Sequence, residues 1–368
     1  MKPSFVFVLA VLAAACQHTG DPPAGVAPTQ SAARPPAKAP PAKVEPDEGE
    51  QRAGIAAGHR LGTPGPAIVL KPLDGEAIDL AKVYGAKPVY LKFWATWCIP
   101  CREQMPAFER IYEALGDRMQ VIAVNAGMDD DEASVRAFRA QYGLRMPIVV
   151  DDGRLAAALD LQVTPQHVLI GRDARIAYVG HLDGPKLDQA IEQVLAAPAP
   201  AVAPAGQQVV VRPAFRVGDL VPAVNVTTVD GKARVVGGAG RPRAVVLFSA
   251  FCESYLKDSV PQTSQACRRV REEIEPLLGG GDVAGTVEWL GLVQGLWTST
   301  ESVTKYQVKT GTKLPLVLDA DGALFRAFGV HHIPTVVLLD RDGRVVRVFG
   351  PDDRGLTEAA QALGRGGK

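Results

Sequence analysis

Two cysteines separated by two residues constrain this chain more than any other feature. Cys98 and Cys101 lie in the stretch Phe93–Arg102, F-W-A-T-W-C-I-P-C-R. The apolar run Val89–Phe93 predicts a buried strand, and apolar residues at helical spacing after the cysteines predict a helix. The start of a helix beside Cys98 favours its thiolate, which attacks disulfides, and Cys101 lies one turn on to resolve the mixed disulfide. The pattern therefore predicts a redox-active dithiol.

Two other interpretations of this cysteine pair fit less well. A structural zinc site needs further ligands at comparable spacing, and the sequence has no second C-x-x-C and no Cys/His pair nearby. An inert buried pair is the other alternative, but the aromatic approach W-A-T-W-C is unusual for an arbitrary core segment. Dithiol exchange itself needs no organic or metal cofactor.

The stretch W-A-T-W-C-I-P-C-R-E-Q-M-P resembles the thioredoxin superfamily, and within it the TlpA/ResA-like group of membrane-anchored thiol–disulfide oxidoreductases. The resemblance covers about Leu61 to Leu195 and continues through Val121–Asn125 and Pro147–Asp151. It implies that Thr164–Pro165 is the family's cis-proline position, which lies against the C-x-x-C and receives substrate backbone. It also implies that Trp97 forms an apolar rim at the site.

Length and composition bound the remaining possibilities. A chain of 368 residues predicts two or three domains. The 40 Lys and Arg residues balance 40 Asp and Glu residues, so no basic surplus suggests a nucleic-acid partner. Five cysteines are too few to indicate a disulfide scaffold.

The first sixteen residues have the pattern of an export signal. Lys2 is followed by the apolar stretch Phe5–Ala15, which is too short to span a bilayer. Cys16 follows at a position that resembles a bacterial lipoprotein signal, although Ala13 stands where that signal has Leu. The alternative is an ordinary secretory signal with an incidental cysteine. Both predict an exported chain whose cysteines work in an oxidising compartment.

Two segments predict connections rather than folded domains. Residues 17–58 are rich in Pro, Ala and Gly and predict a disordered tether. Residues 197–209, with repeated Ala-Pro, predict an interdomain linker. The first folded domain is then expected at 59–196 and the second at 210–368.

The two predicted domains are copies of one another. Motifs recur at a shift of 156 positions near the start of each half, and at a shift of 169 positions near its end. The first set pairs Gly62, Pro66 and Asp74 with Gly218, Pro222 and Asp230, and the second pairs Asp152, Pro165 and Arg172 with Asp321, Pro334 and Arg341. We therefore expect an α/β protein with two tandem thioredoxin-like domains, each a central mixed sheet flanked by helices.

The second domain has no C-x-x-C. Cys252 matches Cys98, but Tyr255 stands where the second cysteine belongs. The spacing from Cys267 to the glycine after the next strand is 28 positions, against 26 from the second cysteine in the first half. Cys267 is thus predicted to pair with Cys252 across an insertion, Glu253–Ala266, with a helix beginning near Cys267. The alternative is a lone thiol at Cys252.

His331 and His332 precede Pro334, the cis-proline position of the second half. In this fold that loop faces the first cysteine, so an imidazole could hold Cys252 as a thiolate. Alternatively, Cys252, His331 and His332 could bind copper. Such a site resembles that of the Sco-like copper proteins, although their close cysteine pair is missing here. An equally good interpretation is that one histidine is solvated and the other packs.

The sequence as a whole predicts an exported thiol–disulfide oxidoreductase. Because C-I-P-C keeps the proline of C-G-P-C, we favour a reductant of disulfides in exported or envelope proteins, supplied by a membrane thiol donor. The expected location is the periplasmic side of a bacterial envelope, through a lipid anchor at Cys16. Lys92 and Gln166 depart from the family pattern and leave the substrate open. The alternatives are a copper chaperone or a non-catalytic binding module built on the second domain.

Overall fold

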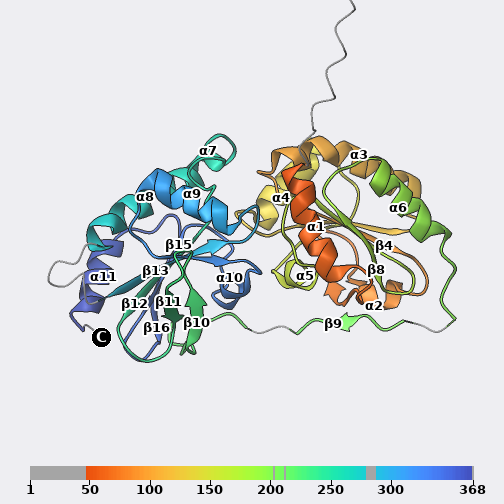
Figure 1. Cartoon of the computed structure of the whole chain (residues 1–368). Helices are drawn as coiled ribbons and strands as arrows, with labels where there is room; N and C mark the ends of the chain where they lie inside the picture. The colour runs from red at the N-terminus through yellow and green to blue at the C-terminus, as the bar shows by residue number, and fades with distance from the viewer. Residues whose placement is uncertain (1–46, 202–203, 211–212, 279–286, 367–368) are drawn as a thin grey trace, which may run out of the picture. The chain divides into compact units, whose positions relative to one another are not determined.

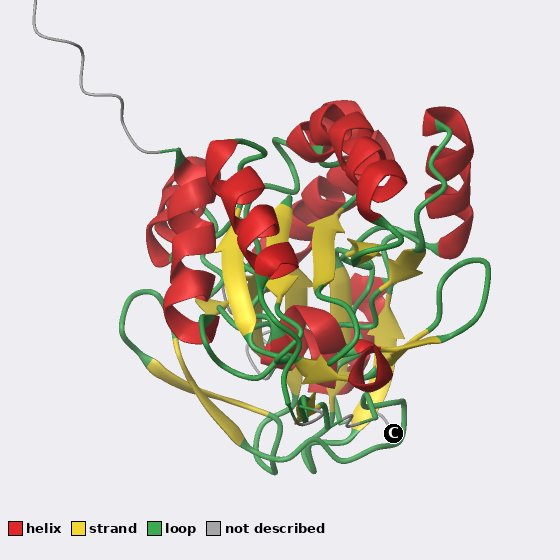
Figure 2. Ribbon diagram, turned by 90° about the vertical axis from the view of Figure 1, so that its right-hand side faces the viewer, coloured by secondary structure: helices red, strands yellow, loops and turns green. Residues whose placement is uncertain are grey.

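The computed structural model describes residues 47–201, 204–210, 213–278 and 287–366, which belong to one compact unit, 46–368. The predicted signal, Cys16 and most of the predicted tether lie outside these residues. We call residues 47–196 the first lobe and residues 213–366 the second lobe. Each lobe has its own sheet, and Figures 1 and 2 show helices packed around the strands.

The first lobe is built on a five-stranded mixed sheet with the order β6-β5-β4-β7-β8. The strands β4, β5 and β6 are parallel, and β7 and β8 are antiparallel to their neighbours. The strands are β4 (Val89–Trp94), β5 (Gln120–Asn125), β6 (Ile148–Val150), β7 (Gln166–Ile170) and β8 (Ile176–Gly180). The helices are α1 (Glu48–Arg60), α2 (Leu80–Val83), α3 (Ile99–Leu115), α4 (Glu132–Tyr142), α5 (Arg154–Ala158) and α6 (Pro185–Ala196). Three short strands lie between α1 and α2: β1 (Pro66–Ala67), β2 (Val69–Leu70) and β3 (Ile78–Asp79).

The second lobe repeats this sheet with the order β14-β13-β12-β15-β16. Its strands are β12 (Arg243–Phe248), β13 (Glu288–Gln294), β14 (Leu316–Asp319), β15 (Thr335–Leu339) and β16 (Val345–Phe349). Its helices are α7 (Leu256–Ser259), α8 (Pro261–Leu278), α9 (Thr300–Thr310), α10 (Ala323–Ala327) and α11 (Leu356–Gly364). A hairpin of β10 (Val224–Thr227) and β11 (Ala233–Val236) precedes the sheet. The predicted fold class is confirmed in both lobes.

The central strand of each sheet explains why the cysteines lie where they do. Every residue of β4 and of β12 is buried, as expected for a strand with neighbours on both sides and helices on both faces. Each strand ends at the same edge of its sheet, four positions before a cysteine. The apolar run Val89–Phe93 thus fixes the strand, and the strand end positions Cys98.

The predicted tether is too long at its C-terminal end. Residues 48–58 belong to α1, which packs against β8. Asp47 caps the helix by accepting a hydrogen bond from the Glu50 N–H (2.8 Å). The Ala- and Gly-rich composition that indicated a tether is also compatible with a helix that packs closely on a sheet.

The linker between the lobes is partly held by the first lobe. Strand β9 (Gln207–Gln208) pairs in parallel with β1, within the segment predicted as linker. Among the described residues, no helix has the length and apolar character required to cross a bilayer.

Candidate active site

Cys98 and Cys101 form a disulfide at the N-terminus of α3, with Cα atoms 5.2 Å apart. Cys98 is the N-cap residue of the helix, and its Sγ accepts a hydrogen bond from the Cys101 N–H at 3.2 Å. When the pair is reduced, this N–H and the positive end of the helix would stabilise a thiolate on Cys98. Both cysteines are buried.

The predicted cis-proline loop lies against this disulfide. The Thr164–Pro165 bond is cis, and the carbonyl oxygen of Thr164 lies 3.4 Å from Cys98 Sγ. Strand β7 begins at the next residue and pairs with β4, so the sheet brings the loop to the cysteines. The backbone of Thr164 therefore lies beside the sulfur that would attack a substrate.

Trp97 is buried rather than exposed as an apolar rim. Its Nε1–H donates to the Met128 carbonyl (2.8 Å), and only 2% of the residue is exposed. Asp130 holds the same loop by accepting hydrogen bonds from Thr96 N–H (2.8 Å) and Asn125 Nδ2–H (2.6 Å). The ring of Trp97 faces Phe251 of the second lobe, with centroids 5.9 Å apart.

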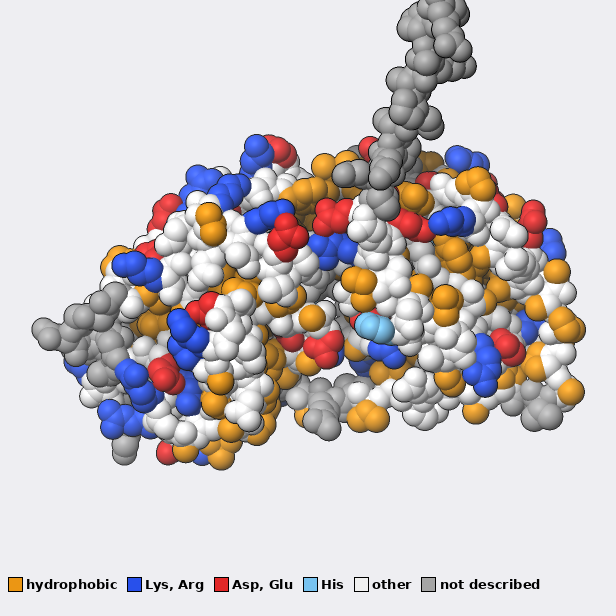
Figure 3. Space-filling view, viewed as in Figure 1, with side chains coloured by type: hydrophobic (Ala, Val, Ile, Leu, Met, Phe, Trp, Pro, Cys, Tyr) orange, Lys and Arg blue, Asp and Glu red, His pale blue; other side chains and the backbone are white. Residues whose placement is uncertain are grey.

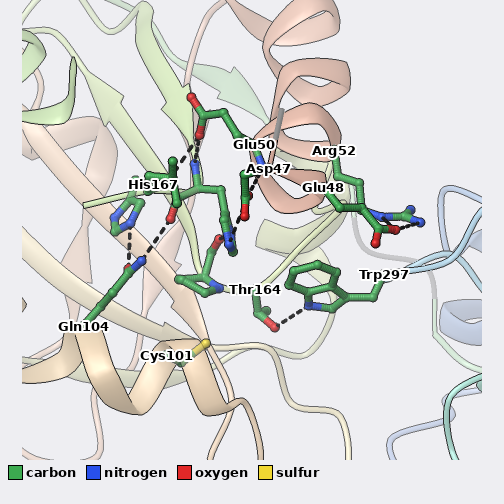
Figure 4. A network of polar contacts seen from close by, with 12 residues as sticks. Asp47, Glu48, Glu50, Arg52, Cys101, Gln104, Thr164, His167 and Trp297 are labelled. Carbon is green, nitrogen blue, oxygen red and sulfur yellow. Dashed lines mark hydrogen bonds and ion pairs between the residues drawn. The ribbon is translucent and has the colours of Figure 1, made fainter. Parts of the chain in front are cut away.

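A buried polar network lies behind the disulfide (Figure 4). Figure 4 shows the contact between His167 and Gln104. Lys92 Nζ and His167 Nε2 both lie within hydrogen-bonding distance of Gln104 Oε1, at 2.9 and 3.0 Å. Because that oxygen only accepts, His167 carries its proton on Nε2, and Nδ1 accepts from the Tyr90 hydroxyl (2.7 Å). Burial lowers the pKa of Lys92 to about 7, and burial together with Lys92 holds the pKa of His167 well below its usual value. Gln104 lies on α3 one turn beyond Cys101 and joins this network to the cysteine helix.

The network continues to the cis-proline through His181, a residue that the sequence did not single out. Gln104 Nε2–H donates to the His181 carbonyl (3.2 Å), and His181 Nδ1–H donates to the Pro165 carbonyl (2.7 Å). The His181 N–H donates to Glu50 of α1 (2.9 Å). Helix α1 therefore supports the cis-proline loop through His181. The sequence signal for α1 was the three-residue spacing of Asp47 and Glu50, which is typical of a capping box.

In the second lobe the structure joins Cys252 to Cys267 by a disulfide, with Cα atoms 6.3 Å apart. The insertion is not a loop that ends near Cys267, because α8 begins at Pro261 and includes Cys267 in its second turn. A proline is favoured in the first turn of a helix, which explains this start. Glu253 holds the insertion in place through a two-point ion pair with Arg271 (2.8 and 3.0 Å).

Comparison with known proteins identifies the first lobe. Residues 61–179 match the model of the AhpC/TSA family. The chain is 34% identical over 138 residues to the thioredoxin-like protein YneN of Bacillus subtilis. The aligned region covers 37% of this chain and 81% of that protein. It is 36% identical over 138 residues to the thiol–disulfide oxidoreductase ResA of Halalkalibacterium halodurans, covering 37% of this chain and 76% of that protein. The chain belongs to the thioredoxin superfamily, as a ResA-like thiol–disulfide oxidoreductase. A thiol:disulfide interchange protein of Chlorobium tepidum, with a solved structure, is 22% identical, with a TM-score of 0.32 over 37% of this chain and 97% of that one.

Three residues around Cys98 in this ResA-like chain, Lys92, Gln166 and Met128, each have a local role in the structure. Lys92 belongs to the buried network. The side chain of Gln166 accepts a hydrogen bond from the Gln162 N–H (3.1 Å), which connects the two sides of the cis-proline loop and stabilises it. The carbonyl of Met128 holds the Trp97 indole. All three therefore stabilise the loops around Cys98.

The copper alternative for the second lobe does not fit the geometry. The sulfur of Cys252 is bonded to Cys267, and His331 and His332 instead lie near the first lobe. His331 Nδ1 is 3.4 Å from the Gly127 carbonyl oxygen, and His332 Nδ1 is 3.9 Å from Asp129 Oδ1. Among the residues that the structure describes, no group of three His, Cys, Asp or Glu side chains could hold a metal ion.

Proposed function

We propose that this ResA-like protein is an exported reductant of disulfides in envelope proteins, with Cys98 as the nucleophile. The observation that supports Cys98 as the nucleophile most directly is the Cys101 N–H bonded to Cys98 Sγ (3.2 Å) at the start of α3, because it favours the thiolate. The Thr164–Pro165 loop beside Cys98 supplies backbone for a substrate strand. The electrons come from a dithiol donor at the membrane, and the chain is held there by a lipid on Cys16.

The proposed reaction balances as two exchange steps. The Cys98 thiolate attacks one sulfur of the substrate disulfide, and the other substrate sulfur leaves as a thiolate and takes a proton. The Cys101 thiol loses its proton and attacks Cys98 Sγ, which re-forms the Cys98–Cys101 bond and releases the second substrate thiol. The substrate gains two electrons and two protons, and the donor dithiol later restores the reduced pair.

Reduction of insulin by the full chain, with dithiothreitol as donor, tests the assignment of Cys98. We expect Cys98→Ser to abolish the catalysed rate and Cys101→Ser to accumulate a mixed disulfide with insulin. Cys16→Ser is the matched control, because it removes a cysteine outside both lobes, and it should keep the wild-type rate. Wild-type activity in Cys98→Ser would refute the assignment.

The lipid anchor is tested separately by mass spectrometry of the mature N-terminus. We expect a chain that begins at Cys16 and carries the added mass of acyl groups. A terminus beyond Cys16, without acylation, would exclude the anchor and leave the exchange chemistry unaffected.

Zero net charge accords with protein disulfides rather than nucleic acid as substrate. Figure 3 shows acidic and basic side chains on the visible face of the molecule, both widely distributed over it.

A further inference from the structure

The two lobes contact each other through equivalent loops. Asp129 lies two positions after Gly127, which follows β5, and Trp297 lies two positions after Gly295, which follows β13. Both residues have positive φ, 53° and 56°. The Asp129 N–H donates to the His331 carbonyl (2.7 Å), and the Trp297 N–H donates to the Gln162 carbonyl (3.0 Å). Each acceptor is three residues before a cis-proline. The contact is therefore reciprocal, as in the interface of a two-fold dimer.

The side chains of the same two residues repeat this reciprocity. The indole Nε1–H of Trp297 donates to Thr164 Oγ1 at 3.2 Å, and Figure 4 shows the ring reaching this threonine. Asp129 Oδ1 accepts a hydrogen bond from the Ile333 N–H at 3.0 Å. Thr164 and Ile333 are the residues that directly precede the two cis-prolines. Each lobe thus occupies the cis-proline loop of the other.

The residues that flank Cys98 also contact the residues that flank Cys252. Trp97 packs on Phe251, and the Ile99 N–H donates to the Tyr255 hydroxyl at 3.2 Å. All four cysteines of the lobes belong to one continuous cluster of buried apolar side chains. The two disulfides therefore share an interior from which bulk water is excluded.

We propose that the two cysteine pairs exchange electrons directly, so that the second lobe is a built-in redox partner of the first site. This rests on the proposed function, because it requires that Cys98 attacks disulfides. A contact that only covered the first site would not need the cis-proline loop of the second lobe, yet the observed contact engages both loops.

The exchange starts with the first pair reduced by an external dithiol. The Cys98 thiolate attacks Cys252 Sγ, the Cys98–Cys252 bond forms, and Cys267 leaves as a thiolate. Cys101 then attacks Cys98 Sγ, the Cys98–Cys101 bond re-forms, and Cys252 leaves as a thiolate. The two protons lost by the first pair are taken up by the second, and two electrons have moved to the second lobe. The reverse sequence returns them.

A trapping experiment on the full chain tests this step. We expect the double variant Cys101→Ser/Cys267→Ser, after mild oxidation, to form an intramolecular Cys98–Cys252 disulfide, identified by non-reducing proteolysis and mass spectrometry. The matched control, Cys98→Ser/Cys252→Ser, leaves Cys101 and Cys267 and should form no link between the lobes. If the first variant still forms a mixed disulfide with insulin but no Cys98–Cys252 link, the relay is wrong and the proposed function stands.

The native chain gives a second test that does not depend on variants. The oxidised protein is mixed with one molar equivalent of dithiothreitol, quenched with N-ethylmaleimide at intervals and analysed by mass spectrometry. A relay predicts that the reduced state, reported by which cysteine pair is labelled, passes from one pair to the other. The rate of this change should be independent of protein concentration. A rate proportional to protein concentration, or a second pair that is never labelled, would contradict it and would leave the second lobe as a cover for the first site.

Discussion

The two lobes have the same strand order but differ in what lies behind the disulfide. In the first lobe Lys92, Gln104 and His167 form a hydrogen-bonded network in the interior. Sheet pairing and the alignment of the cysteine helices give the counterparts in the second lobe as Val246, Val270 and Val336, all buried and apolar. The fold alone therefore needs none of the three polar residues. Burying these three polar side chains costs free energy of folding, which indicates that they have a role in the chemistry of the first site.

The disulfides themselves differ in their relation to the helix. Cys98 and Cys101 are three positions apart in sequence, whereas Cys252 and Cys267 are fifteen positions apart. Cys252 lies before α7 with its Sγ 3.6 Å from the Thr263 carbonyl oxygen, which cannot stabilise a thiolate. Cys98 Sγ also lies near a carbonyl oxygen, that of Thr164 (3.4 Å), but in addition it accepts a hydrogen bond from the Cys101 N–H. Cys98 is therefore the better nucleophile of the two, so the relay begins with its attack on Cys252.

The largest expected effect concerns stability. Replacing Cys252 and Cys267 by Ala should lower the free energy of unfolding by about 3 kcal/mol, because this disulfide closes the longer loop in the unfolded chain. The Cys98–Cys101 disulfide closes a much shorter loop, so replacing both of these cysteines by Ala should cost about 2 kcal/mol on the same model. Urea unfolding of the two double variants measures both values. A larger loss for the Cys98/Cys101 variant would reverse the comparison.

The next effect tests the buried lysine. Because the pKa of Lys92 is about 7 in the folded lobe and 10.5 when exposed, the unfolded chain binds more protons between these values. The contribution of Lys92 to stability is therefore complete above pH 10.5 and is lost as the pH falls through 7. We expect wild type to gain about 2 kcal/mol relative to Lys92→Met between pH 7 and pH 9.

Urea unfolding at both pH values, followed by the signal of the first lobe, measures this difference. Val246→Met, at the equivalent position of the second lobe, is the control: it keeps Lys92, so its difference in stability from wild type should be the same at both pH values. An unchanged difference between wild type and Lys92→Met across this range would mean that Lys92 is charged in the folded lobe.

A third effect weakens the contact between the lobes. Trp297→Ala removes the indole that binds Thr164 and should shift the equilibrium towards separated lobes by about 1–2 kcal/mol. Alkylation of Cys98 in the reduced protein by a bulky maleimide should then be roughly tenfold faster. Val308→Ala, at an exposed position of α9, should leave that rate unchanged. Equal rates in all three proteins would mean that the lobes do not shield Cys98.

Sequence patterns predicted the fold of both lobes and favoured the pairing of Cys252 with Cys267 over a lone thiol, and the structure has this disulfide. The apolar runs before Cys98 and Cys252 specified the central strands, and the matched cysteine-to-glycine spacings indicated Cys267 as the partner of Cys252. The helix start was predicted less well. Pro261 was recognised as a break, but its preference for the first turn places the start of α8 there and not near Cys267.

Other features could not be obtained from local patterns because they depend on contacts between distant segments. Helix α1 is Ala- and Gly-rich and has a weak apolar stripe, so its contact with His181 decides its position. Trp297 follows an apolar strand as an ordinary loop residue, and only the docked lobes give it Thr164 as a partner. The burial of Trp97, expected to be a rim, has the same cause.

The smallest expected effect is the pH dependence of lobe docking through Asp129. Burial at the contact raises the pKa of Asp129 to about 7, and Asp129 Oδ2 is buried without a hydrogen-bond partner among the described residues. A raised pKa means that docking is favoured by protonation, so its contribution is complete below pH 4 and is lost as the pH rises through 7. The nearest basic group is His332, 3.9 Å away. We expect docking to weaken by about 1 kcal/mol from pH 6 to pH 8.

Hydrogen exchange of the Asp129 and Ile333 amides, corrected for the intrinsic rate at each pH, measures this change. Asp129→Asn keeps the acceptor for the Ile333 N–H and removes the titration, so its protection should be the same at both pH values. His332→Gln distinguishes the neighbouring imidazole, and it should retain the wild-type loss of protection. If protection in wild type increases with pH, Asp129 is ionised in the docked state and its charge strengthens the contact with the second cis-proline loop.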